Sequence, residues 1–262
     1  MEEINGTVLE QGIAAIAPED LWLGGEGQLN DRGFIPFRPI TSYCLSADLG
    51  KRHDRTALCL LRRQRLPIPI EQEDSIDSCC RQKGGPDVYS VLALERLEVG
   101  LDYGPQMDIL KDRWVRAQSR AGRIPVQVAI DASGVGDGVV EMATTRGLDF
   151  IAVKITGGTL DSDRRGNEWT VSKSALCSRL AGAFHSKSIR IMSSLLDADA
   201  LIQELQNFTA SISDAGVATY AGSGRGGGKF DDLVLSLAIN LLVLGDKANL
   251  GGNSWSVVPN FI

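Results

Sequence analysis

The chain has 262 residues, of which 43% are hydrophobic, so it can build a sizeable core as one large domain or two small ones. A formal net charge of −6 excludes a uniformly basic nucleic-acid-binding protein, because contacts to phosphate need Lys and Arg. Seven acids against two arginines in residues 1–40 account for −5 of that charge, so the rest of the chain is nearly neutral.

The first predicted elements follow a long N-terminal extension. Residues 1–41 mix Gly, Pro and acids with short apolar pieces and show no sustained period, which is typical of an extension or linker. The short apolar runs 43–49 and 56–61 predict two strands of a hairpin. Residues 62–87 are polar and contain several Pro and Gly, so we expect an exposed loop there.

The middle of the chain has a strand-helix-strand rhythm. Residues 88–99 alternate enough for a third strand, and residues 105–120 carry apolar side chains at helical spacing. Apolar runs at 126–130 and 150–155 predict two further strands, with a helix at 139–145 between them. This rhythm is typical of a parallel sheet and predicts an α/β fold.

The last third of the chain is predicted to be mostly helical. Residues 157–167 look like a loop, and residues 172–184 and 195–208 predict helices. Residues 209–220 predict a small hairpin. The strongly apolar stretch 231–244 predicts a final helix, whose first turn carries two acids, as the helix dipole favours.

Four aspartates stand at the ends of these elements. Asp48 and Asp131 each end an apolar strand, and Asp231 and Asp232 open the last helix. If the two strands are parallel neighbours, both carboxylates emerge at one sheet edge, where a helix packed across that edge can add the acid pair. Hard cations prefer carboxylate oxygens, and two such ions promote phosphodiester hydrolysis. We therefore predict one acidic site that binds divalent ions and cleaves nucleic acid, although each Asp alone is more typical of a helix cap or a turn.

Four sequence stretches resemble the C-terminal nuclease domain of the large terminase subunit of tailed bacteriophages. They are S-A-D-L-G-K-R-H-D-R-T-A-L (46–58), V-A-I-D-A-S-G-V-G (128–136), V-S-K-S-A-L followed by L-I-Q-E-L-Q-N-F, and K-F-D-D-L-V-L-S-L-A (229–238). The resemblance spans roughly residues 42–246 and leaves 1–41 as an extension and 247–262 as a tail. It implies an RNase H-like α/β fold, with a central mixed β-sheet flanked by α-helices.

The resemblance also implies roles for particular residues. The metal ligands would be Asp48, Asp131, Asp231 and Asp232, holding two Mg²⁺ or Mn²⁺ ions, with Asp232 as the main ligand of its pair. The candidates for DNA contact are Lys51, Arg52, Lys173, Arg225 and Lys229. The basic stretch after Asp48, which continues with Arg55, Arg62, Arg63 and Arg65, is typical of either a solvated loop or a phosphate contact.

The implied function is a metal-dependent endonuclease that cuts concatemeric double-stranded DNA during phage packaging, in the host cytoplasm. Its partners would be a terminase ATPase module, the small terminase subunit and the portal. The sequence has no G-x-x-x-x-G-K-[ST] match, and Phe230 stands where the stretch G-R-G-G-G-K-F would need Ser or Thr, so the ATPase must come from elsewhere. Two alternatives remain: another RNase H-like nuclease such as a junction resolvase, or a non-catalytic packaging module that docks to partners.

Membrane and zinc-binding classes are not favoured. The longest apolar run, 233–244, is interrupted by Ser236 and Asn240 and falls short of the ~20 residues that a membrane-spanning helix needs. The N-terminus lacks a basic region followed by an apolar one, so no secretory signal is predicted. The five cysteines contain no C-x-x-C pair, and we expect them to be reduced.

Overall fold

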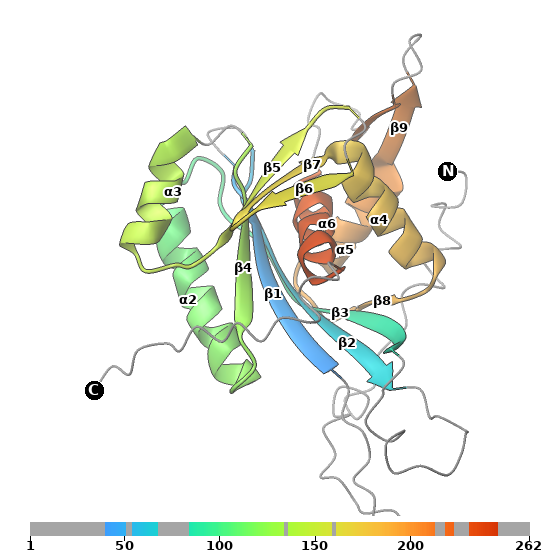
Figure 1. Cartoon of the computed structure of the whole chain (residues 1–262). Coiled ribbons are helices and arrows are strands. Elements are labelled where there is room, and N and C mark those ends of the chain that lie inside the picture. Colours follow the sequence, from blue (N-terminus) through green and yellow to red (C-terminus); the bar gives the residue numbers. More distant parts are fainter. Residues whose placement is uncertain are drawn as a thin grey trace, which may run out of the picture.

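The fold is built on one large mixed sheet, shown in Figure 1. The computed structural model describes residues 40–50, 54–67, 84–133, 136–158, 161–212, 218–222 and 231–245. The strands of the sheet are β1 (Ile40–Asp48), β2 (Ala57–Pro67), β3 (Gly84–Arg96), β4 (Val126–Asp131), β5 (Ile151–Thr156), β6 (Ser162–Arg165), β7 (Glu168–Ser172) and β8 (Ile189–Ile191). Their order is β6-β7-β5-β4-β1-β2-β3-β8.

The sheet combines parallel and antiparallel strand pairs. β1, β2 and β3 form an antiparallel meander, and β6 pairs antiparallel with β7. β1 with β4, β4 with β5, β5 with β7, and β3 with β8 are parallel. The predicted α/β fold with a central mixed sheet flanked by helices is therefore confirmed.

Helices cover both faces of the sheet (Figure 1). One face carries α2 (Tyr103–Ala121) and α3 (Gly136–Thr145), and the other carries α4 (Lys173–His185), α5 (Ala198–Asn207) and α6 (Asp232–Gly245). A separate antiparallel hairpin, β9 (Phe208–Ile212) and β10 (Ala218–Gly222), confirms the hairpin predicted at 209–220. In the described residues, no helix is both long and apolar enough to cross a membrane.

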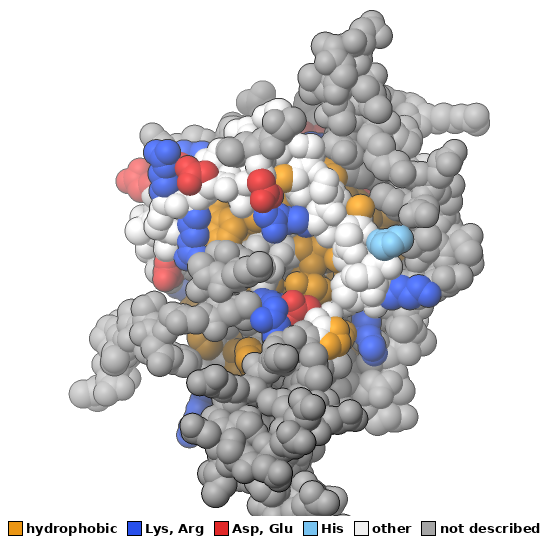
Figure 2. All heavy atoms as spheres, turned by 45° about the vertical axis from the view of Figure 1, so that its right-hand side comes forward, with side chains coloured by type: hydrophobic (Ala, Val, Ile, Leu, Met, Phe, Trp, Pro, Cys, Tyr) orange, Lys and Arg blue, Asp and Glu red, His pale blue; other side chains and the backbone are white. Residues whose placement is uncertain are grey.

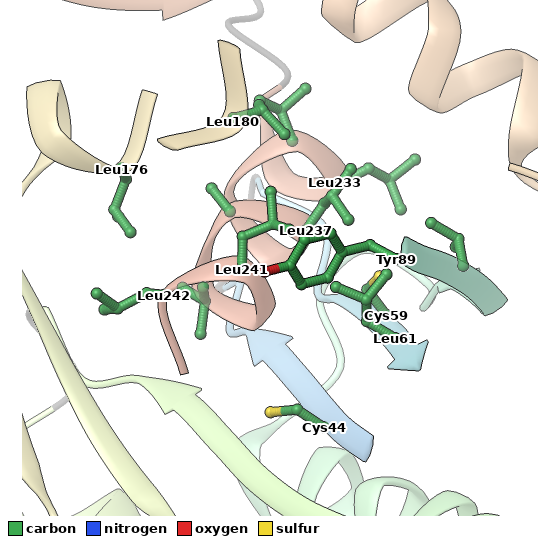
Figure 3. Close-up of a cluster of buried hydrophobic side chains, with 14 of the residues drawn as sticks. Cys44, Cys59, Leu61, Tyr89, Leu176, Leu180, Leu233, Leu237, Leu241 and Leu242 are labelled. Carbon is green, nitrogen blue, oxygen red and sulfur yellow. The ribbon is translucent and has the colours of Figure 1, made fainter. Parts of the chain in front are cut away.

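Each face of the sheet has its own hydrophobic core, because successive side chains of a strand point to opposite faces. In β1, Cys44 faces the α6 side of the sheet and Leu45 faces the α2 side, as the two-residue period of a strand requires. Helix α6 is apolar on nearly all sides and is therefore buried on nearly all sides, with residues 232–234 and 236–244 buried. Figure 3 shows its leucines meeting Cys59 and Leu61 of β2 and Tyr89 of β3.

Two predicted loops are wrong in part. The polar segment 62–87 is shorter than expected, because β2 continues to Pro67 and β3 begins at Gly84. Arg63 is only 3% exposed there, since it donates to the carbonyl of Leu244 and pairs with Asp87 at 2.8 Å. The predicted loop 157–167 contains the exposed edge strand β6, and the short strand β8 was not predicted.

Buried polar contacts fix the position of α6 on the sheet. The Ser46 hydroxyl donates to the carbonyl of Ser236 at 2.7 Å, and Asn240 Nδ2 donates to the carbonyl of Cys59 at 2.8 Å. All of these groups are fully buried, so each bond satisfies a donor that water cannot reach. The first turn of α6 is thereby held at the end of β1, two residues beyond Ser46.

Replacing Asn240 with Ala should destabilise the fold. The change leaves the cavity of a buried side chain and removes a buried hydrogen bond, so we expect the free energy of unfolding to fall by about 1–3 kcal/mol. Urea unfolding followed by circular dichroism measures the loss. Leu196→Ala is the control, because Leu196 is 89% exposed and its truncation should cost less than about 0.5 kcal/mol. Equal midpoints for the two variants would contradict the anchoring role.

Candidate metal centre

The strand ends that carry Asp48 and Asp131 lie side by side. β1 and β4 are parallel neighbours with Ala47 opposite Ile130, so the next residue of each strand is an aspartate at the same edge. Cys44 and Ala129 belong to the core on the α6 side, and the period of two places Asp48 and Asp131 on that side as well. Helix α6 packs against β1, β2 and β4 and begins at Asp232. The arrangement predicted for these elements is therefore the one observed.

The four aspartates act on one another electrostatically. The pKa of the Asp48 carboxyl is raised well above its usual value, first by burial and then by the negative charges of Asp131, Asp232 and Asp231. Lys173 acts in the opposite direction. Acids that are distant in the sequence thus form one cluster around the end of β1.

Asp232 has the smallest exposed fraction of the four aspartates. It is 9% exposed, and its Oδ2 atom has no hydrogen-bond partner among the residues that the structure describes. Burial raises the pKa of its carboxyl to about 7, and the charges of Asp231 and Asp54 add to the effect. A buried carboxylate oxygen without a donor is costly, which makes this atom a candidate ligand for a cation.

Asp131 and Asp231 are held by near neighbours. The backbone N–H of Ser133 donates to Asp131 Oδ1 at 2.7 Å, and this contact opposes the rise in the Asp131 pKa that burial causes. Asp231 Oδ2 accepts from Lys173 Nζ at 2.5 Å. Lys173 opens α4 directly after its N-cap Ser172, whose hydroxyl accepts from the N–H of Ala175. Lys173, predicted as a DNA contact, therefore lies in the acidic cluster itself.

The turn after Asp48 is fixed by a small polar network. Gly50 N–H donates to the hydroxyl of Thr56 at 3.0 Å, and Gln106 Nε2 donates to the Gly50 carbonyl at 2.9 Å. The Thr56 hydroxyl in turn donates to Gln106 Oε1 at 2.7 Å. A Cβ atom at position 50 would stand 2.3 Å from the Asp54 carbonyl oxygen, so the turn needs glycine. The end of β1 is thus held on both sides of the sheet.

The four aspartates lie near one another but are not arranged as a complete set of metal ligands. Among the described residues, no group of three His, Cys, Asp or Glu side chains is arranged to hold a metal ion. Repulsion between neighbouring carboxylates, about 4 kcal/mol for two charges ~4 Å apart at an effective dielectric of 20, opposes closer approach without a cation. The ion pair between Lys173 and Asp231 also occupies one of the four carboxylates.

The basic residues singled out in the sequence divide into two groups. The candidates Lys51, Arg52, Arg225 and Lys229 lie outside the described residues. Arg62 and Arg63 are not the solvated loop or phosphate contact that the basic stretch indicated, because both are buried in β2. On the face shown in Figure 2, the described Lys and Arg side chains lie scattered among acids and do not form one continuous basic surface.

One buried acid beside the cluster was missed from the sequence. Glu204 of α5 is 5% exposed and accepts hydrogen bonds from the backbone N–H groups of Leu233 and Val234, at the start of α6. The sequence did indicate that Glu204 is buried, because it stands between the core positions Leu201 and Leu205 on the apolar face of its helix. Burial raises the pKa of this carboxyl to about 7, and the charge of Asp232 contributes to that rise.

Two solved structures that resemble this chain are terminase nuclease domains. No protein-family model and no curated protein sequence matches the chain. The large terminase nuclease from the thermophilic phage G20c, solved with bound magnesium, is 21% identical, with a TM-score of 0.48 over 79% of this chain and 83% of that one. The human cytomegalovirus terminase nuclease domain, soaked with manganese, is 11% identical, with a TM-score of 0.44 over 78% of this chain and 83% of that one.

Proposed function

We propose that the chain is the nuclease of a phage DNA-packaging terminase, a metal-dependent endonuclease that cleaves concatemeric double-stranded DNA by phosphodiester hydrolysis. The observation that carries the proposal is the convergence of Asp131, Asp231 and Asp232 on Asp48, whose carboxyl pKa is raised well above its usual value first by burial and then by these three charges. Such a cluster is unfavourable in the absence of a cation and provides only hard oxygen donors. Divalent ions of the Mg²⁺ or Mn²⁺ type match these donors.

The donor chemistry of these four aspartates fits such ions. Asp48, Asp131, Asp231 and Asp232 would hold two Mg²⁺ or Mn²⁺ ions, which when bound would activate water and stabilise the leaving oxygen. The free Oδ2 atom of Asp232 favours this residue as the main ligand of its pair, because Asp231 Oδ2 is already bound to Lys173. The backbone N–H of Ser133 orients Asp131, and Lys173 partly neutralises the cluster in the absence of a metal.

DNA and packaging partners complete the proposal. Lys173 lies at the cluster, where it can exchange Asp231 for a phosphate of the substrate. The other candidate contacts are Lys51, Arg52, Arg225 and Lys229. An ATPase module, in the same polypeptide or a separate one, would act with this nuclease in the host cytoplasm, together with the small terminase subunit and the portal.

Nicking of supercoiled plasmid DNA tests the proposal. We expect the purified chain to convert the plasmid to nicked and linear forms in Mn²⁺ or Mg²⁺, and EDTA to stop the reaction. A four-way junction incubated in parallel separates the nearest alternative, since a junction resolvase would cut the junction in preference to linear duplex. Failure to cut any of these substrates with either ion would favour the non-catalytic docking module instead.

A further inference from the structure

The first turn of α6 is capped from another helix. The N–H groups at the start of an α-helix lack partners within the helix, and the side chain of the preceding residue usually accepts from them. In α6 that preceding residue is Asp231, whose Oδ2 is bound to Lys173. The N–H groups of Leu233 and Val234 donate instead to Glu204 Oε2, at 2.9 and 3.2 Å.

Glu204 is itself held in place from β3. Its Oε1 atom is buried, finds no hydrogen-bond partner in the described part of the chain and lies 3.9 Å from Arg96 Nη1. Arg96 is fixed by Asp197, which accepts from both its backbone N–H at 3.0 Å and its Nε at 3.1 Å. The carboxylate of Glu204 is therefore placed between the end of β3 and the start of α6.

Capping a helix with a buried glutamate costs free energy, because the carboxylate is removed from water. An exposed Ser, Thr, Asn or Asp at the N-cap position supplies about 1 kcal/mol without the cost of burying a charge. The acid pair at the start of α6 could serve this purpose, and the cap from Glu204 releases it from doing so. The cap from buried Glu204 is explained if the carboxylates of Asp231 and Asp232 are required for another role, such as binding a cation.

We infer that Glu204 is a positioning residue of the metal centre: by capping α6 from α5, it sets where the helix begins and leaves the carboxylates of Asp231 and Asp232 to bind cations. The inference rests on the proposed function, because it takes those two aspartates as ligands. Residues that orient metal ligands without touching the metal commonly change affinity by about 10- to 100-fold when they are removed.

Binding of Mn²⁺ without DNA, measured by isothermal titration calorimetry, tests the inference. Glu204→Ala should raise the dissociation constant for Mn²⁺ by about 10- to 100-fold. Glu204→Gln keeps an acceptor oxygen for both N–H groups, so its affinity should lie closer to the parent than to Glu204→Ala. Asp87→Asn is the matched control: it breaks the ion pairs to Arg63 and Arg65 at the far end of β2, and should bind Mn²⁺ as the parent does.

Cleavage kinetics add a second measurement. Glu204→Ala should lower kcat at a fixed Mn²⁺ concentration, recover part of it as Mn²⁺ is increased, and leave KM for DNA unchanged. A general loss of folded protein would not give this recovery. Circular dichroism should show a cooperative unfolding transition for each variant.

The outcomes separate this inference from the proposed function. Parent-like Mn²⁺ affinity in folded Glu204→Ala would overturn the inference, and so would a Glu204→Gln variant as weak as Glu204→Ala. If Glu204→Ala does not fold, Glu204→Asp decides, because it keeps the charge but is too short to reach the N–H groups; parent-like binding by this variant would overturn the inference. Absence of Mn²⁺ binding in the parent, or parent-like binding by Asp48→Asn, would count against the proposed function itself.

Discussion

Asp48→Asn should reduce metal-dependent cleavage of DNA by on the order of 100-fold or more, and should make the metal-free protein more stable. Residues that only orient a metal ligand cost up to about 100-fold, and a direct ligand should cost at least as much. The gain in stability has a separate cause. Burial and three neighbouring acids raise the pKa of Asp48, so its ionised form destabilises the fold at neutral pH. An amide of the same shape removes that repulsion.

Plasmid nicking and thermal unfolding in EDTA measure the two effects. A gain of about 1 kcal/mol corresponds to a rise in Tm of roughly 2–4 °C for a domain of this size. Asp108→Asn provides the control, because Asp108 is a 65% exposed carboxylate on α2 that pairs with Arg146 and lies outside the cluster. It should cut DNA as the parent does and show no rise in Tm. Parent-like cleavage by Asp48→Asn would refute the site assignment, and a lower Tm in EDTA would refute the repulsion.

The arrangement at the end of β1 was predictable because it follows from local patterns. Apolar runs that end in Asp48 and Asp131 predicted two strands, and the shared site was expected on the condition that these strands are parallel neighbours. Those two statements suffice to place both carboxylates at one edge of the sheet. The strongly apolar stretch after Asp231 likewise predicted a buried helix, because no exposed helix has that composition.

Contacts between distant residues were not predictable in the same way. Arg62 and Arg63 look like part of a solvated loop, but β2 pairs with β1 and β3 through both residues, and the Arg63 side chain contacts Asp87 and the Leu244 carbonyl. Strand β6 is polar because it is an exposed edge, so it lacks the apolar signal of a strand. Glu204 has a role only once α5 and α6 are seen together.

The metal-free protein should lose stability as the pH rises from about 4 to about 7. The folded-state pKa of Asp232 is raised from 3.8 to about 7, and that of Glu204 from 4.5 to about 7. Between those values the folded protein holds protons that the unfolded chain has released. The stability from these groups is therefore complete below their unfolded pKa values and is lost as the pH passes through the folded ones.

Ion pairs elsewhere do not obscure this window. The pKa of Asp87 is lowered: its hydrogen bonds and charge pairing with Arg65 and Arg63 outweigh the largest single effect, burial, which raises it. The stabilisation that comes from ionised Asp87 is complete above the unfolded-state pKa of its carboxyl. It therefore stays constant as the pH rises from about 4 to about 7. A rise of about three units in one buried carboxyl corresponds to a few kcal/mol, so Tm in EDTA should fall by roughly 5–10 °C between pH 4.5 and pH 7.5.

Mn²⁺ should reverse this loss at the upper end of the window. The ion binds ionised carboxylates, so protons compete with it much more strongly at pH 5 than at pH 7.5. A concentration 100 times the dissociation constant adds about 2.7 kcal/mol, and Tm should therefore rise by roughly 5–10 °C at pH 7.5 and by much less at pH 5. Thermal unfolding at both pH values, with Mn²⁺ or EDTA, measures the difference. In Asp232→Asn both the loss in EDTA and the recovery with Mn²⁺ should be smaller. An equal effect of Mn²⁺ at the two pH values would mean that the buried acids are not its ligands.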